Sequence, residues 1–79
     1  MSEEIIYSFQ TKAGTFYISF RHGSWHVAHN RESLGSYQKP EQASKALATG
    51  ETEYLPPGLN PEMLGISANI DDWEWEWMR

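Results

Sequence analysis

Hydrophobic and polar residues alternate with a period of two along the first part of the chain, a pattern typical of β-strands. In residues 15–21 the apolar side is formed by Phe16, Ile18 and Phe20, and the residues between them point the other way. Residues 5–10 alternate in the same manner. The pattern predicts two antiparallel strands joined by the turn TKAG, which ends in a glycine.

The alternation continues after a second turn, HGS, and predicts two further strands. In WHVAHN, Trp25 and Val27 lie on one side, and His26, Ala28 and Asn30 lie on the other. The polar turn RES then leads into LGSY, a short fourth strand that we expect at an edge because Gly35 weakens it. This part of the chain therefore predicts an antiparallel meander of three to four strands.

One amphipathic helix is predicted after the meander. Pro40 suits the first helical position, where its missing N–H costs nothing, and Gly50 is placed to end the helix. The resulting fold class is α+β, with one helix covering one side of a small antiparallel sheet. We expect its core to contain Phe16, Ile18, Phe20, Trp25, Val27, Leu34, Ala43 and Leu47.

The remaining residues, 51–79, lack this regularity and predict an irregular, acidic C-terminal arm. Its apolar side chains are suited to pin it back on the sheet-and-helix unit of residues 5–50; they are Leu64, Ile66, Ile70 and Trp73. At 79 residues, the whole chain from residue 1 to residue 79 is expected to form a single domain.

Composition favours a small soluble protein of a reducing compartment. The chain contains no Cys, so no disulfide can form. The first residues, MSEEIIYSFQ, have neither the basic segment nor the apolar run of a signal peptide. No stretch approaches the roughly 18 apolar residues that a membrane span requires. We therefore expect a cytoplasmic protein that does not enter a membrane.

The net charge of −5 is unevenly distributed along the chain. Residues 5–48 contain five Lys or Arg and two acidic residues, together with all three histidines. Residues 49–79 contain seven acidic residues, with Arg79 as their single Lys or Arg. Such asymmetry can mark an interaction surface, or the two halves can simply neutralise each other within the fold.

The pattern W-x-V … LG-x-Y-x-x-P-E-Q-A-x-x-A lies within residues 21–50, at Trp25, Val27, Leu34, Gly35, Tyr37, Glu41, Ala43 and Ala46. It resembles the DNA-binding domain of plant ethylene-response factors, to which integrase arm-type domains are similar. The resemblance implies a three-stranded antiparallel sheet packed on one helix. That family reads the DNA major groove with Arg and Trp side chains on the free face of its sheet. Here only Arg21 and Arg31 offer that chemistry.

The free face of the predicted sheet is one candidate site. It would carry basic and aromatic side chains, namely Tyr17, Arg21, His26, Asn30, Arg31 and Tyr37. Such side chains on one sheet face suit contact with a nucleic-acid backbone and stacking with its bases. The alternatives are an ordinary solvated face and a face that the C-terminal arm covers.

Metal binding and catalysis find little support in the sequence. His22, His26 and His29 lie close together, but His26 and His29 would point to opposite faces of one strand. A pair formed by a histidine and Glu32 has no nucleophile or oxyanion motif beside it, and the chain has no glycine-rich phosphate loop. We therefore predict no metal, no cofactor and no enzymatic activity.

The final segment, DDWEWEWMR, is the most unusual part of the chain. If it is extended, its three tryptophans share one side and the glutamates between them share the other. If it is helical, Trp73 aligns with Ile70 and becomes the last core residue, which is the interpretation that explains Trp73 best. Trp75 and Trp77 are then surplus to the core. They would anchor a partner, or else they would cover bare sheet within the same molecule or be disordered.

The sequence thus predicts a small non-enzymatic binding module whose partner is another protein. Acidic side chains between aromatic ones would complement a basic surface, and a DNA-mimicking inhibitor is the extreme form of this hypothesis. The predicted partner-binding residues are Asp71, Asp72, Glu74, Trp75, Glu76 and Trp77. The alternative function is nucleic-acid binding through the free face of the sheet.

The charge balance generates one prediction about DNA. Because the net charge is −5 and the free face offers few arginines, we expect no tight binding to double-stranded DNA at physiological salt. A gel-shift titration at about 0.15 M salt checks this. Submicromolar binding would contradict the prediction and would restore the DNA-binding function that the family resemblance implies.

Overall fold

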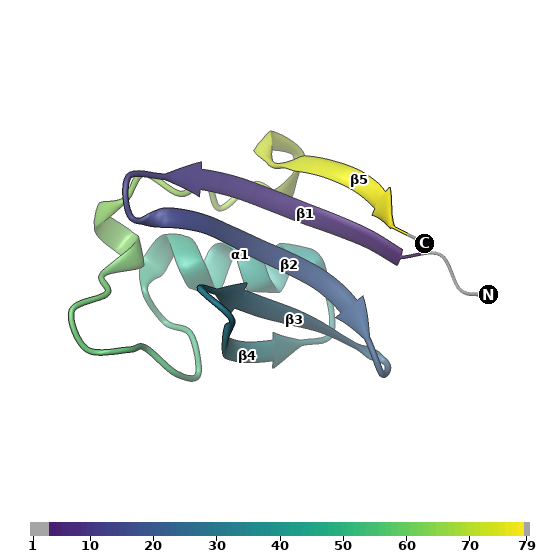
Figure 1. Ribbon diagram of the computed structural model, residues 1–79, viewed down its shortest axis with the longest axis horizontal. Coiled ribbons are helices and arrows are strands. Elements are labelled where there is room, and N and C mark those ends of the chain that lie inside the picture. Colours follow the sequence, from purple (N-terminus) through teal and green to yellow (C-terminus); the bar gives the residue numbers. More distant parts are fainter. Residues whose placement is uncertain (1–3, 79) are drawn as a thin grey trace.

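The computed structural model describes residues 4–78, which form five strands, one α-helix and two short 3-10 helices (Figure 1). In chain order these are β1 (Glu4–Thr11), β2 (Gly14–Arg21), β3 (Ser24–His29), β4 (Glu32–Tyr37), α1 (Pro40–Thr49), η1 (Pro61–Met63), η2 (Ile70–Asp72) and β5 (Glu74–Met78). The α+β class is confirmed.

All five strands belong to one antiparallel sheet with the order β4-β3-β2-β1-β5. The first four strands form the predicted meander, with β4 at one edge. The prediction of three to four strands is wrong in number, because the sheet has a fifth strand, β5, which pairs with β1 (Figure 1). The segment expected to be an irregular arm therefore ends in regular structure.

Two tight turns fix the register of the meander. His22 and Gly23 join β2 to β3, and Asn30 and Arg31 join β3 to β4, and all four residues have positive φ. Two consecutive residues with positive φ match the right-handed twist of a hairpin. The resulting register places Phe9 opposite Phe16, and Ile18 opposite Val27. Apolar side chains of neighbouring strands thereby share one face.

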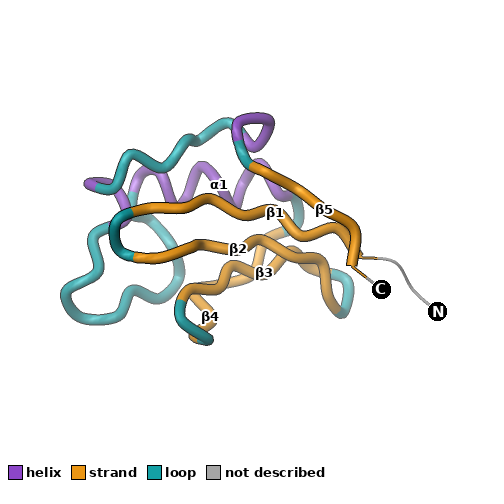
Figure 2. The backbone as a smooth tube through the Cα atoms, turned by 45° about the horizontal axis from the view of Figure 1, so that its top comes forward, coloured by secondary structure: helices purple, strands orange, loops and turns teal. Residues whose placement is uncertain are grey.

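Helix α1 has the ends that the sequence predicts. Pro40 occupies the first turn, and Gly50 ends the helix with a φ of 74° while its N–H points to the carbonyls of Ala46 and Leu47. The helix lies across one face of the sheet and contacts β2, β3 and β4 (Figures 1 and 2). The buried side of α1 contains Ala43, Ser44, Ala46 and Leu47, and the small side chains of the first three allow this close approach.

The core between α1 and the sheet contains most of the predicted residues. Phe16, Ile18, Val27, Leu34, Ala43 and Leu47 are fully buried. Trp25 is only half-buried, and Phe20 is a wrong prediction because 43% of its surface is exposed. Both lie toward the end of the sheet that projects past α1 (Figure 1). Strand alternation identified their face correctly but could not show how far the helix extends.

The segment after α1 completes the core over β1, where the helix makes little contact. Ile66, Ile70 and Trp73 are buried there, and the Trp73 ring lies 5.3 Å from that of Phe9. Ser44 Oγ donates a hydrogen bond of 2.7 Å to the carbonyl of Ala68. These contacts confirm that apolar residues of the segment hold it against the sheet-and-helix unit.

His29 has a structural role that the sequence did not reveal. Its ring is buried and stacks on Phe16 with 4.4 Å between the ring centroids. Nε2 donates a hydrogen bond of 2.9 Å to the carbonyl of Ala13 in the turn between β1 and β2. His26 lies on the opposite face of β3, as the odd spacing predicts.

None of the helices described within residues 4–78 has the length and apolar character that a membrane span requires.

Leu47 is expected to be essential for stability, because its side chain is fully buried between α1 and the sheet. Replacing Leu47 with Ala should lower the free energy of unfolding by about 2–5 kcal/mol, through lost burial and the cavity left behind. The matched control is Lys45→Ala on the exposed side of the same helix, with an expected effect of at most about 0.5 kcal/mol. Equal urea midpoints for the two variants would contradict the prediction.

Candidate functional site

Strand β5 carries two of the most exposed large apolar side chains in the described chain. Trp75 lies opposite Tyr7, and Trp77 opposite Ile5, so both tryptophans are on the same sheet face as α1. Their exposed fractions are 57% and 55%. The two rings contact each other edge to face, with 6.2 Å between centroids. Pairing with β1 therefore holds both rings in place without burying them.

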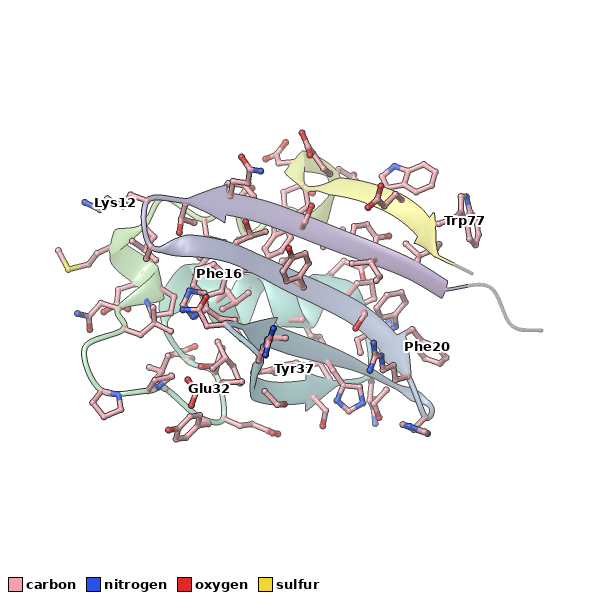
Figure 3. The ribbon with its side chains drawn as sticks, in the orientation of Figure 1. Lys12, Phe16, Phe20, Glu32, Tyr37 and Trp77 are labelled. Atoms are coloured by element: carbon pink, nitrogen blue, oxygen red, sulfur yellow. The ribbon has the colours of Figure 1, made fainter. Side chains whose placement is uncertain are left out.

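These rings continue into a larger apolar surface, the aromatic end, which comprises Ile5, Tyr7, Phe20, Trp25, Trp75 and Trp77. Trp25 links its members, with its ring 5.9 Å from that of Tyr7 and 5.2 Å from that of Phe20. Phe20 and Trp77 lie at the end of the sheet that extends beyond α1 (Figure 3). Phe20 is exposed for this reason, and the aromatic end gathers apolar side chains of four strands on one face of the sheet.

Glu74 and Glu76 are exposed on the other face of β5, opposite Ser8 and Ile6. Strand β5 therefore presents tryptophan on one face and carboxylates on the other. The extended interpretation of this segment is confirmed for Glu74–Met78, and the helical one is wrong. Trp73 is nevertheless buried as predicted, because its ring packs in the core beside Phe9, and its Nε1 donates to the carbonyl of Ser67 at 3.0 Å.

The other two predicted partner-binding residues, Asp71 and Asp72, precede β5 in η2. Both are exposed, but each has a local structural contact. The backbone N–H of Asp71 donates to the Asn69 side chain at 3.0 Å, and Ser67 Oγ donates to Asp72 Oδ2 at 2.7 Å. The structure thus places four of the six predicted residues on β5 and the other two at its entrance.

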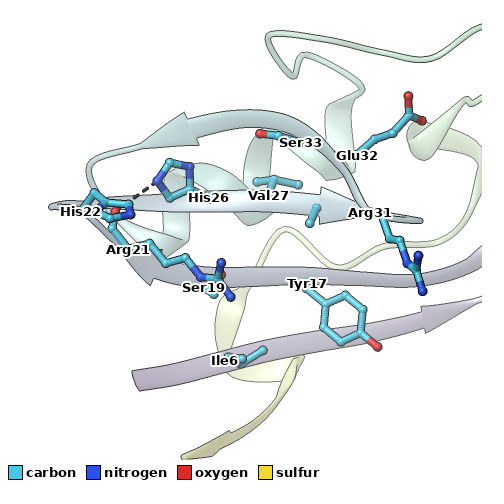
Figure 4. Close-up of a pocket in the computed structure, with 11 residues that line it drawn as sticks. Ile6, Tyr17, Ser19, Arg21, His22, His26, Val27, Arg31, Glu32 and Ser33 are labelled. Atoms are coloured by element: carbon cyan, nitrogen blue, oxygen red, sulfur yellow. Dashed lines mark hydrogen bonds between the residues drawn. The ribbon is translucent and has the colours of Figure 1, made fainter. Parts of the chain in front are cut away.

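The free face of the sheet holds a shallow hollow of about 460 Å³ (Figure 4). Arg21 and His26 lie at one end, and Tyr17 and Arg31 lie at the other. His26 Nε2 is 3.1 Å from the carbonyl of Arg21, which fixes the ring at the rim. Four of the six residues predicted for a nucleic-acid face therefore gather around one depression, whose floor includes small side chains such as Ser19 and Ala28.

Asn30 and Tyr37 do not belong to this hollow. Asn30 occupies the turn between β3 and β4 and is not among the lining residues. Tyr37 lies opposite Trp25, on the helix side of the sheet. The cause is a β-bulge: Val27 pairs with Gly35 and Ala28 with Ser33, so Leu34 is an extra residue and the alternation shifts. Burial raises the pKa of the Tyr37 hydroxyl.

Within residues 4–78, no three His, Cys, Asp or Glu side chains are placed to share a metal ion. The charged side chains of the hollow are basic apart from Glu32, so the chemistry it offers is binding of an anion or a base. The aromatic end offers apolar contact, with carboxylates on the reverse face of β5.

Comparison with known protein families, curated proteins and solved structures finds no match. The resemblance of residues 21–50 to a DNA-binding domain stays a prediction.

The exposure of the tryptophans can be measured directly. Trp75 and Trp77 should account for most of the quenching of tryptophan fluorescence by acrylamide, because Trp73 is only 3% exposed and Trp25 is half-buried. Replacing both Trp75 and Trp77 with Phe should lower the mean quenching constant clearly. A matched Trp25→Phe variant should leave it unchanged or slightly higher. A constant that stays the same in the double variant would mean that the two rings are shielded.

Proposed function

We propose that this protein is a small, non-enzymatic protein-binding module that acts in the cytoplasm and contacts its partner through the aromatic end and β5. One observation carries the proposal: two tryptophans, each more than half exposed, are fixed on a paired strand, on the same sheet face as the exposed Phe20. Large apolar patches on a small protein mark interaction surfaces more often than scattered apolar residues do.

The energetics favour tryptophan as the anchor of such a contact. Each ring can bury roughly 150–250 Å² of surface, and a tryptophan at the centre of an interface often contributes about 2 kcal/mol or more, a factor of roughly thirty in affinity. Trp75 and Trp77 are already ordered by β1 and by each other. Binding would therefore cost little additional side-chain entropy.

The charges near this surface favour a basic partner. Glu74 and Glu76 are exposed on β5, and Asp71 and Asp72 stand at its entrance. Carboxylates at the rim of an interface mainly raise the association rate with a positively charged surface and make it fall with salt. A DNA-mimicking inhibitor, which would bind a nucleic-acid enzyme, is one form of such a partnership.

Nucleic-acid binding is a second candidate function, which the hollow on the free face favours. Tyr17 would stack on a base, and Arg21 and Arg31 would contact phosphates. The net charge of −5 and the small number of arginines make this candidate the less favoured one. Single-stranded oligonucleotides, whose bases are accessible for stacking, are the appropriate probe.

Capture experiments with matched variants separate the two candidates. Trp75→Thr combined with Trp77→Thr removes the rings, and the high strand propensity of Thr preserves β5. This variant should lose a protein that the unaltered chain captures from cell extract, while its melting temperature stays within a few degrees. The control, Tyr17→Ala with Arg21→Ala, should retain that protein. Loss in the control but not in the tryptophan variant would contradict the proposal and favour the free face.

A further inference from the structure

The two edges of the sheet differ in how they are protected. At the β4 edge, the following loop supplies partners: Tyr54 N–H donates to the carbonyl of Leu34 at 3.0 Å, and Glu53 Oε1 accepts from Ser36 N–H at 3.4 Å. At the other edge, β5 is the last strand of the described part of the chain. Its outward backbone groups have no strand beside them among residues 4–78. An unprotected edge is a template for a further strand.

The side chains of β5 specify what such a strand would carry. Neighbouring residues on adjacent strands share a face, so alternate side chains of an added strand would lie beside Trp75 and Trp77, and the others beside Glu74 and Glu76. Apolar side chains fit the first set of positions and basic side chains fit the second. An alternating apolar–basic segment is therefore complementary to β5 on both faces at once.

We propose that β5 binds an extended, alternating basic and apolar segment of a partner protein as a sixth, antiparallel strand of the sheet. This inference rests on the proposed function and specifies its mode. Main-chain hydrogen bonds to β5 would supply affinity, and the alternation would supply specificity and register. The aromatic end would cover the apolar side chains of the bound segment.

A second copy of this chain does not satisfy the same requirements. If two β5 strands paired antiparallel with their faces matched, glutamates of one copy would lie opposite glutamates of the other, in either register centred on Trp75 or Glu76. Like charges directly opposite each other destabilise strand pairing. The basic segment replaces that repulsion with attraction, which is why the occupant is a partner and not a copy.

The test uses the full chain and a synthetic eight-residue peptide in which Lys and Val alternate. Titration followed by amide shifts of the isotope-labelled protein should show saturable binding, with shifts concentrated in β5 and β1. A peptide with four Lys followed by four Val has the same composition and should bind at least tenfold more weakly. Glu74→Lys with Glu76→Lys should weaken binding at least tenfold, whereas the charge-matched control Glu41→Lys with Glu51→Lys should not.

Backbone methylation tests the strand mode itself. Alternate N–H groups of a strand point to the same edge, so N-methylation of the odd residues and of the even residues blocks opposite edges of the peptide. One methylated peptide should lose at least tenfold in affinity and the other should bind within about threefold of the parent. Equal effects of the two patterns, or a β5-dependent dimer in sedimentation equilibrium, would overturn strand addition.

The outcomes also separate this inference from the proposed function. If the alternating peptide does not bind, while capture of a partner still depends on Trp75 and Trp77, strand addition is wrong and the protein-binding function stands. If capture does not depend on these tryptophans, both proposals are overturned. If capture depends on these tryptophans and the peptide binds with unequal methylation effects, both are supported.

Discussion

Helix α1 is too short to cover the sheet on which it packs, and the distribution of buried and exposed aromatic side chains depends on this difference. Ten helical residues extend about 15 Å, whereas the eight residues of β1 or β2 extend about 26 Å. Phe16 and Ile18 lie under the helix and are fully buried. Phe20, further along the same face, lies beyond it and is exposed, so one continuous apolar face serves partly as core and partly as surface.

The segment after α1 covers the part of the sheet face formed by β1, with which the helix makes little contact. It contains no long helix, and its burial comes from a few well-placed residues, chiefly Ile66, Ile70 and Trp73. Hydrogen bonds from Ser44 to Ala68 and from Trp73 to Ser67 satisfy polar groups that this packing buries. Trp73 also sets the direction in which the chain leaves the core. Strand β5 can therefore begin at the next residue, in register with β1.

The local elements were predictable from the sequence because their causes are local. Alternation identified the meander, and Pro40 and Gly50 marked the ends of α1. Strand β5 was not predicted, since its partner β1 lies at the opposite end of the chain and the spacing of the tryptophans also fits a helix. Tyr37 was assigned to the wrong face because the bulge at Leu34 breaks the period of two. Both errors involve pairing between strands, which periodicity within one strand does not report.

The candidate site could be predicted as a set of residues but not as a surface. The sequence identified Trp75 and Trp77 as surplus to the core, and the structure adds Tyr7 opposite Trp75, with Trp25 and Phe20 further along the same sheet face. That addition changes the hypothesis, because an isolated arm would lose conformational entropy on binding, whereas a paired strand has already lost it. A ring held on β5 is thus a better anchor than the same ring on a flexible tail.

The two candidate surfaces also constrain each other electrostatically. Glu74 and Glu76 on β5 share the free face with Arg21 on β2, and only β1 lies between the two strands. Adjacent strands are about 4.8 Å apart, so this separation is roughly 10 Å, comparable with the screening length of about 8 Å at physiological salt. A polyanion that followed the hollow toward β5 would therefore meet repulsion. A basic segment on β5 would not, because it would neutralise the glutamates, and occupancy of β5 would make the adjacent hollow more attractive to anions rather than compete with it.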